Sequence, residues 1–173
     1  SEDVLNLIRS NFSIKESIFD KSISDAIDSD FSDGSIENTE FSNIGNDSID
    51  ISGSKVTLKN IKILSSGDKG ISVGEKSNLL ASNINIKDAF IGIASKDLSF
   101  VSLNNFKGEN LEICMAAYQK KSEYGPALIA VNNNLDSCGN KEFVLENRSS
   151  IKYISKQILP NTKNAYKELY PLD

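Results

Sequence analysis

The sequence predicts an all-β fold: a single-stranded parallel β-helix of about seven coils of about 22 residues, with an asparagine ladder and a short C-terminal cap. Three observations support this prediction. Ile-x-Ile and similar motifs recur at a nearly constant interval, asparagine recurs at one phase of that interval, and acidic or glycine-rich turns separate the motifs. The stretches GNDSIDISGS, from Gly45 to Ser54, and GDKGISVGEKS, from Gly67 to Ser77, show the repeat directly.

One column of apolar residues defines the coil length. It consists of Leu5, Ile27, Ile49 and Ile71 at intervals of 22, and continues with Ile91 and Ile113 at intervals of 20 and 22. Alternation such as Ile49-Asp50-Ile51 is typical of a strand with one buried face. A coil of this length holds two or three short strands and pairs with the next coil at about 4.8 Å. We therefore expect these residues to stack inside a solenoid.

Two further columns repeat in step with the first. An apolar column consists of Val56, Leu79, Val101, Ile129 and Ile151, with intervals of 23, 22, 28 and 22. An asparagine column consists of Asn38, Asn60, Asn83, Asn105 and Asn133, with intervals of 22, 23, 22 and 28. Asparagine tolerates the left-handed conformation at turns, and stacked amides can hydrogen-bond along the axis. A leucine-rich-repeat horseshoe is disfavoured because its Leu-x-x-Leu-x-Leu frame is absent.

The asparagine ladder and the coil length resemble right-handed parallel β-helices of the pectin-lyase-like superfamily, over roughly Leu5 to Tyr153. The strings DAIDSDFSDG, GNDSIDISGS, DKGISVGE, GIASKDLS and AYQKKSEYG are similar to β-helix regions that accompany spore-coat-kinase-like (CotH-type) proteins. This resemblance implies an accessory module of a larger surface or secreted protein. Any kinase-like domain would lie outside this chain, which has no Gly-rich phosphate loop and no catalytic-loop motif.

Composition excludes several classes of partner. The 173 residues carry a net charge of −5 with lysines and acids interspersed, so no basic stripe is available for nucleic acid or an anionic membrane. No apolar run approaches the roughly 20 residues that span a bilayer. We expect any export signal to lie upstream of Ser1, and an extracellular or cell-surface location. Cys114 and Cys138 are expected to be packed thiols rather than a metal site or a bridge, and the chain has no histidine.

The domain organisation predicted is a β-helix over residues 1–155 followed by a cap or tail over residues 156–173. Because Leu5 is already in strand phase, no residues remain to cover the open edge of the first coil, so we expect an upstream domain of the same protein or a partner to cover it. Pro160 and Pro171 flank TKNAYKEL, which predicts at most a short helix and a plausible C-terminal cap.

Outward columns are where a β-helix can carry chemistry. The column beside the strand centres is expected to contain Asp28, Asp50, Ser72, Gly92 and Cys114. Asp28 and Asp50 would lie one coil apart, about 5 Å, where they raise each other's pKa unless a cation lies between them. Together with Asp30 they could bind calcium, whereas the alternative is a plain solvated surface. Turn capping alone accounts for Asp25, Asp33, Asp47 and Asp68.

One coil is longer than the others, and its extra residues are predicted in a loop from Ala117 to Pro126. Insertions in solenoids form loops, and loops on a rigid scaffold concentrate binding residues. The candidate ligand-binding residues are Tyr118, Gln119, Lys120, Glu123 and Tyr124, with the tyrosines stacking on sugar rings and the polar side chains bonding hydroxyls or carboxylates. The alternative is a loop that only shields the C-terminal coils.

The function predicted is a non-catalytic carbohydrate-binding, adhesion or structural module that binds a polysaccharide or cell-surface glycan. The alternative is a calcium-assisted polysaccharide lyase or glycoside hydrolase, with Asp50, Lys69, Lys96 and Asp97 as catalytic candidates. The only arginines, Arg9 and Arg148, lie at opposite ends of the stack, which disfavours an arginine base. No cofactor is expected apart from possible calcium.

Overall fold

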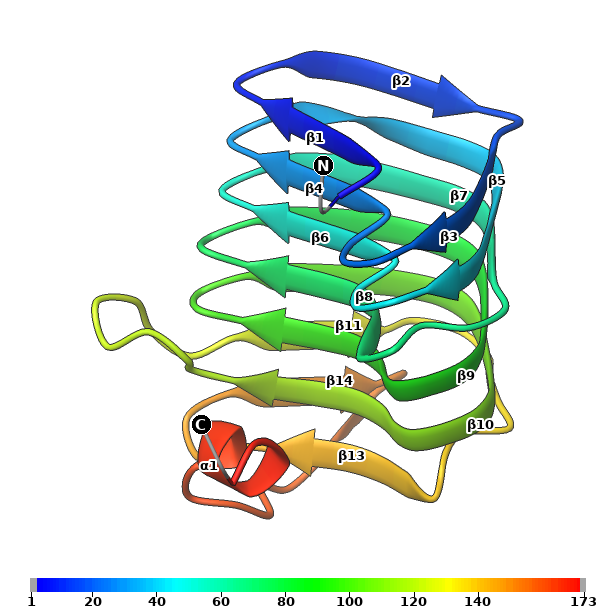
Figure 1. The fold of residues 1–173 in the computed structure, drawn as a ribbon. Helices are drawn as coiled ribbons and strands as arrows, with labels where there is room; N and C mark the ends of the chain where they lie inside the picture. The colour runs from blue at the N-terminus through cyan, green and yellow to red at the C-terminus, as the bar shows by residue number, and fades with distance from the viewer. Residues whose placement is uncertain (1–2, 172–173) are drawn as a thin grey trace.

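Successive coils pair in parallel at an offset of about one repeat, and the chain winds into a β-solenoid of about seven turns of about 22 residues (Figure 1). The computed structural model describes residues 3–171. The predicted all-β parallel solenoid is confirmed. Within residues 3–171, no helix has both the length and the apolar character needed to cross a membrane.

The strands stack into three walls. The first, called the front wall below, contains β1 (Leu5–Ile8), β4 (Ile27–Asp30), β6 (Ile49–Ser52), β8 (Lys69–Gly74), the C-terminal segments of β9 (Asn78–Lys96) and β10 (Phe100–Tyr118), and β13 (Lys141–Leu145). The second contains β2 (Asn11–Lys15), the N-terminal segments of β5 (Asp33–Ile44), β7 (Lys55–Ile63), β9 and β10, then β11 (Leu128–Val131) and β14 (Ser150–Tyr153). The third contains β3 (Ile18–Ser22), later segments of β5, β7, β9 and β10, and β12 (Leu135–Asp136).

The core consists of the inward-facing apolar rows. Ile27 pairs with Ile49, Ile49 with Ile71 and Ile71 with Ile93, and all four side chains are 0% exposed. The predicted continuation of this row through Ile91 and Ile113 was wrong, because those residues pair with Lys69 and with each other on the outer side of the wall. The second predicted row, Val56, Leu79, Val101, Ile129 and Ile151, is confirmed by the register.

A corner at the start of the front-wall strands explains the error. Residues Gly92 and Ile93 both face inward: a Cβ on Gly92 would lie 2.9 Å from Leu111 Cδ1, and Ile93 belongs to the core. Strict alternation is therefore broken at this corner, so that Ile91 faces outward although it lies two residues from Ile93. Period-two reasoning assigns both isoleucines to the same face, and the pairing with the neighbouring coil separates them.

The asparagine ladder forms at the corner between the second and third walls. The side-chain amides of Asn60, Asn83 and Asn105 each donate to the carbonyl of the asparagine one coil earlier, at 2.8, 2.9 and 3.0 Å, beginning at Asn38. All four residues have positive φ, between 50° and 57°, which asparagine accepts at lower cost than most residues. The fifth predicted member, Asn133, is wrong, because Phe106 pairs with Leu135 and so places Asn134 beside Asn105.

A second ladder, built from serine, closes the corner between the front and second walls. The backbone N–H groups of Ser10, Ser32, Ser54 and Ser77 each donate to the hydroxyl of the serine one coil later, the last of which is Ser99, at 2.9 to 3.1 Å. From Ser32 onward these residues are buried, so the hydroxyls satisfy turn N–H groups that no strand pairing reaches. The interval of 22 or 23 residues between these serines was present in the sequence.

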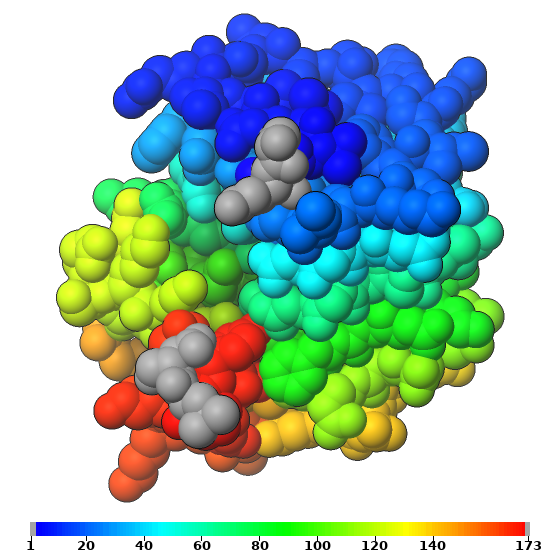
Figure 2. Space-filling model, in the orientation of Figure 1, coloured from blue at the N-terminus to red at the C-terminus, as the bar shows by residue number. Residues whose placement is uncertain are grey.

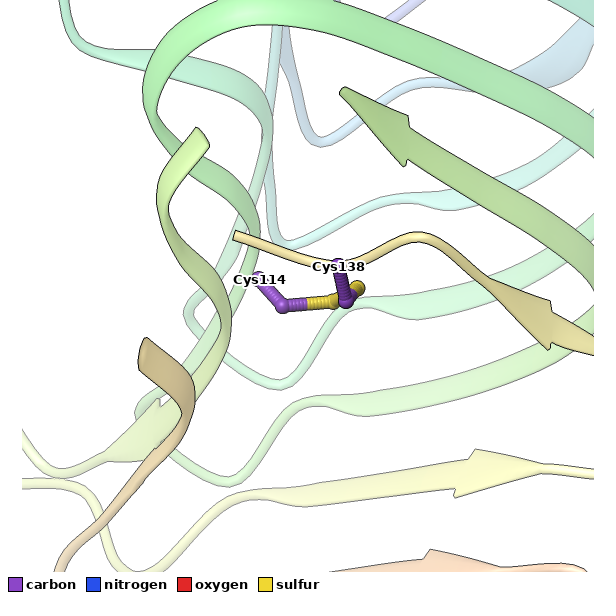
Figure 3. Close-up of a disulfide and its surroundings, with 2 residues drawn as sticks. All are labelled: Cys114 and Cys138. Atoms are coloured by element: carbon purple, nitrogen blue, oxygen red, sulfur yellow. A yellow bond between two sulfur atoms is a disulfide. The ribbon is translucent and has the colours of Figure 1, made fainter. Parts of the chain in front are cut away.

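Cys114 and Cys138 form a disulfide, so the prediction of two packed thiols was wrong (Figure 3). Cys114 lies on β10 and Cys138 in the segment between β12 and β13, 24 residues later, with 5.2 Å between their Cα atoms. The segment that the bridge closes contains β11 and β12.

The two ends of the solenoid differ. At the C-terminal end, β15 (Lys156–Gln157) pairs antiparallel with β14, and the side chain of Asn161 bonds the backbone of Phe143 and Leu145 in β13. The tail thus covers part of the last coil before α1 (Ala165–Leu169) turns back along the front wall (Figure 1). At the other end, β1, β2 and β3 each pair with a strand of the next coil on one side.

Candidate functional site

The outward side chains of the front wall change from acidic to apolar along the axis. Asp28 pairs with Asp50 and Asp50 with Ser72, as predicted, but the column then continues with Ala94 and Ala116. Gly92 and Cys114, predicted in this column, face the core instead. The neighbouring outward column runs through Asp47, Lys69, Ile91 and Ile113. The last coils therefore present an apolar surface where the first coils present carboxylates.

The helix α1 packs on that apolar surface. Its buried residues Ala165 and Leu169 form a separate apolar cluster with Ile91, Ile113, Ala94, Ala116, Tyr118 and Val144. Asn164 caps the helix by accepting a hydrogen bond from the Lys167 N–H at 3.0 Å. This docking turns Tyr166 and Tyr170 toward the polar side chains of the middle coils.

A cavity of about 200 Å³ lies where the acidic and apolar parts of the front wall meet. Figure 2 shows that the front wall is hollowed between α1, the second and third coils, and the loop at residues 119–127, called the insertion loop below. The cavity is lined by Asn46, Asp47, Asp50, Asp68, Lys69, Lys96, Tyr118, Lys120, Tyr166 and Tyr170. Five of these, Asp50, Lys69, Lys96, Tyr118 and Lys120, are among the site residues that the sequence predicted.

Lys69 forms the buried ionic centre of the cavity. It is 7% exposed, its Nζ lies 3.5 Å from Asp47 Oδ1, and it also forms an ion pair with Asp68. Burial disfavours its charged form, but the carboxylates of Asp47 and Asp68 outweigh that effect and raise the pKa of Lys69 above its usual value. The Tyr170 hydroxyl donates to Asp68 at 2.9 Å, and the Lys69 ammonium lies 5.3 Å from the Tyr170 ring centroid. Lys69 is therefore a fixed cation.

Two carboxyl groups of the front wall have strongly raised pKa values. Burial raises the pKa of Asp47 to about 7, against the lowering effect of Lys69. Burial and then the negative charges of Asp30 and Asp50 raise the pKa of Asp28 to about 6. At the cavity, two carboxylates thus share one lysine. Asp28 instead lies beside carboxylates of the same charge, which repel its ionised form.

Asp50 projects into the cavity without a protein partner for one of its oxygens. Its Oδ1 atom is buried and accepts no hydrogen bond from residues 3–171. Asp28 and Asp30 lie on the same wall, yet within the described part of the chain no three acidic or cysteine side chains are grouped so that they could hold a metal ion. The predicted calcium ligands Asp28, Asp30 and Asp50 therefore do not assemble into a metal centre in this structure.

Lys96 and Lys120 lie on the side of the cavity nearest the insertion loop. Lys96 Nζ donates to Ser72 Oγ at 2.7 Å, and Lys120 Nζ lies 5.1 Å from the centroid of the Tyr166 ring. Burial, followed by the positive charges of Lys96 and Lys69, lowers the pKa of Lys120. In residues 3–171, neither Lys96 nor Lys120 forms an ion pair with a carboxylate.

The insertion loop, residues 119–127, lies where the sequence predicted it. Tyr118 pairs with Lys96, 22 residues earlier, whereas Ile129 pairs with Val101, 28 residues earlier, so the extra residues fall between them. The Gln119 side chain donates to the Tyr124 carbonyl at 2.7 Å and so holds the loop closed.

The predicted ligand-binding residues of this loop have different surroundings. Tyr118 is 1% exposed, so its ring offers no face to a sugar. Tyr124 lies beside Glu75 and under Lys76, and Glu123 is exposed at the loop surface. Only Lys120 and Tyr118 of the five predicted residues line the cavity.

Asp97 is a structural residue in this arrangement. It is buried, and its Oδ1 accepts hydrogen bonds from the backbone N–H groups of Lys120 and Lys121 at 2.7 and 2.8 Å. It holds the start of the insertion loop and does not line the cavity, although the sequence suggested it as a catalytic candidate.

Four important side chains of the cavity were not predicted as site residues: Asp47, Asp68, Tyr166 and Tyr170. The capping role assigned to Asp47 is real, since its Oδ1 accepts the Lys69 N–H at 2.9 Å, but the same carboxylate also pairs with the Lys69 ammonium. The 22-residue interval between Asp47 and Lys69 could have shown that the two lie on adjacent coils. Tyr166 and Tyr170 lie in the tail, outside the repeats, so no 22-residue interval relates them to the front wall.

A family model described as "Right handed beta helix region" matches residues 6–158, which is nearly the whole solenoid. The search of curated proteins and the search of solved structures each returned no match. The family match supports the resemblance to parallel β-helices. It adds nothing to the narrower resemblance to β-helix regions of CotH-type proteins.

Proposed function

Since the chain belongs to the right-handed β-helix family, whose scaffold does not by itself set an activity, we propose that it is a non-catalytic saccharide-binding module. The ligand lies in the front-wall cavity between the insertion loop and α1. The observation that carries this proposal is the buried Oδ1 of Asp50, an acceptor without a donor among residues 3–171 that belongs to a side chain lining the polar cavity. A buried acceptor of this kind costs free energy unless a ligand or solvent group satisfies it.

The lining of the cavity suits a ligand rich in hydroxyl groups. It offers an acceptor at Asp50, donors at Lys96 and Lys120, and the tyrosine rings of α1 at one side. Sugar hydroxyls both donate and accept hydrogen bonds, so one hydroxyl-rich ring can satisfy Asp50 and the lysines together. An apolar ligand would leave all of these groups unsatisfied.

Binding is favoured over catalysis by the state of the candidate bases. Lys69 is held as a cation between two carboxylates and cannot accept a proton from a sugar. Asp97 is committed to the loop backbone, and Lys96 already donates to Ser72. The calcium-assisted lyase or glycosidase remains the alternative that the following experiment tests.

The test is titration calorimetry with a panel of plant, bacterial and animal polysaccharide fragments, on the wild type and on Asp50→Asn. We expect binding by at least one fragment and roughly tenfold weaker binding by Asp50→Asn, because a charge-assisted hydrogen bond is lost. Asp136→Asn, on the exposed β12, is the matched control and should bind like the wild type. If no fragment binds, or if Asp50→Asn binds unchanged, the proposal fails. New reducing ends or unsaturated products would establish the catalytic alternative.

An extracellular or cell-surface location is part of the proposal. The disulfide between Cys114 and Cys138 supports it, because such bonds form and persist in oxidising compartments and are rare in the cytosol. Expression of the chain in an oxidising and in a reducing compartment of the same host should give the bridged form only in the first. Two free thiols after oxidising expression would contradict this part of the proposal.

We further propose that another segment of a longer protein covers the first coil. The strands β1, β2 and β3 are paired on one edge, and Ile8, Ile18 and Ile23 are exposed there. Unpaired edges with exposed apolar residues promote association. The isolated chain should therefore self-associate at high concentration, and Ile18→Lys should reduce the association seen by light scattering. A monomer at every concentration would count against a covered edge.

A further inference from the structure

Charge is distributed unevenly along the cavity. At its base, the single cation Lys69 pairs with two carboxylates, Asp47 and Asp68, so this side carries one net negative charge when both are ionised. Toward the insertion loop, Lys96 and Lys120 contribute two positive charges, and Asp50 is the one carboxylate of the cavity lining that is not paired with Lys69. The negative charge of Asp50 favours the charged form of Lys120. Within residues 3–171, however, Asp50 forms no ion pair with Lys96 or Lys120. Two cations and one carboxylate leave a surplus of one positive charge at this side.

Within residues 3–171, neither lysine forms an ion pair with a carboxylate. Lys96 donates to a neutral hydroxyl, Ser72 Oγ, and Lys120 lies over a tyrosine ring. Each ammonium has three donor hydrogens, so both can bond a further acceptor. Lys121 differs from both, because this half-buried lysine of the same loop forms an ion pair with Glu75.

From this surplus we propose that the cavity contains an oxyanion subsite, in which Lys96 and Lys120 together bind a carboxylate or sulfate group of the saccharide. The inference rests on the proposed saccharide-binding function and adds the class of ligand. An oxyanion accepts charge-assisted bonds from both ammonium groups, while a neighbouring hydroxyl of the same sugar donates to Asp50 Oδ1. The ligand class is therefore an acidic saccharide.

The acidic coils above the cavity orient that ligand. Asp28 and Asp30 lie toward the N-terminal end of the front wall, and within residues 3–171 neither forms an ion pair with a lysine or arginine. An oxyanion would be repelled there, whereas hydroxyl groups can donate to these carboxyls. The bound saccharide thus directs its anionic group toward the insertion loop and its hydroxyl groups toward the first coils.

The experiment uses three tetrasaccharide probes of matched length: one containing glucuronate, one containing sulfated galactose, and neutral cellotetraose. We expect at least one acidic probe to bind roughly tenfold more tightly than the neutral one. The carboxylate and sulfate arms identify which oxyanion the subsite accepts. Lys96→Met and Lys120→Met should each remove the preference for the acidic probe, and Lys96→Arg should keep part of it.

The matched control is Lys59→Met, an exposed lysine of β7 on another wall, which should leave all three affinities unchanged. Circular dichroism and thermal melts establish that each variant is folded. Equal affinity for neutral and acidic probes, or an acidic preference that survives both methionine variants, overturns the oxyanion subsite while the saccharide-binding function stands.

If none of the three probes binds, a separate measurement decides the inference. Sodium sulfate, compared with sodium chloride at the same ionic strength, should raise the melting temperature of the wild type more than that of Lys96→Met. That result would keep the subsite and reject these saccharides as ligands. An equal response of the two proteins would overturn the subsite as well.

Discussion

Replacing Lys69 by methionine removes the cation that, within residues 3–171, forms ion pairs with the buried Asp47 and the half-buried Asp68. The side chain is 7% exposed, and methionine has a similar length without the charge. Asp47, 3% exposed, would then be buried near Asp68 without an ion-pair partner among residues 3–171, and only the more distant charge of Lys96 would favour its ionised form. Breaking a buried ion pair by removing one partner costs about 3 to 5 kcal/mol. We expect Lys69→Met to lose this amount of unfolding free energy at pH 8.

The unfolding free energy that Lys69→Met loses should be smaller at low pH, because Asp47 can take up a proton. Its pKa is about 7 in the native protein, above the value near 3.9 of an unfolded aspartate. The native state therefore binds more protons between these values, and this carboxyl contributes stability that grows as the pH falls through about 7 toward 4. Without Lys69 the pKa of Asp47 rises further, so the gain on acidification is larger in the variant than in the wild type.

Urea unfolding at pH 5 and pH 8 measures both effects. The double variant Asp47→Asn/Lys69→Met should recover most of the loss at pH 8. The amide carries no charge, and its Oδ1 still accepts the hydrogen bond from the backbone N–H of residue 69. Lys59→Met, exposed on β7, is the control and should change the free energy by less than about 0.5 kcal/mol. An equal loss at the two pH values, or a double variant no more stable than the single one, would refute this account of the cavity charges.

Three other predictions concern the scaffold and its acidic coils. Asn60→Ala should cost about 2 to 3 kcal/mol in urea unfolding, because it removes two ladder hydrogen bonds and places alanine at a φ of 54°, and Asn60→Gly should recover the backbone part. The Cys114→Ser/Cys138→Ser variant should lose about 3 kcal/mol by releasing a loop closed over 24 residues, and an unchanged melting temperature would contradict this. The native pKa of Asp28 is raised to about 6, so the carboxyl favours the folded state increasingly as the pH falls from about 7 to 4; Asp28→Asn should flatten this part of the stability profile, and an identical profile would contradict the assignment.

The repeat made most of the fold predictable. Any residue type that must occupy the same place in each coil recurs at the coil length, so the isoleucine rows and the asparagine ladder could be read before the structure was known. The errors arose where two candidates lay close together. Ile93 follows Ile71 by 22 residues, whereas Ile91 follows it by 20, so the coil length itself favoured Ile93, which the pairing confirms. Asn133 and Asn134 both suit the ladder, and the pairing of Phe106 with Leu135 decides between them.

The site was only partly predictable, because it combines repeated and unrepeated parts. Asp50, Lys69 and Lys96 belong to the coils, and their positions on one wall follow from the register. Tyr166 and Tyr170 come from the tail, which has no period to relate it to the wall. Their position depends on apolar packing of α1, a tertiary contact that local sequence patterns do not encode.

The place of the cavity follows from the order of residues along one outward column. This column passes from Asp47 to Lys69 and then to Ile91 and Ile113. The two isoleucines need an apolar cover, which α1 supplies, and the helix ends its contact where the column becomes charged. Lys69 lies at this boundary, so its ammonium has the ring of Tyr170, which directly follows α1, on one side and Asp47 on the other. If Ile91 instead faced the core, the apolar surface on which α1 packs would be lost and the cavity would not form. The register of a single coil therefore decides whether the front wall has this cavity.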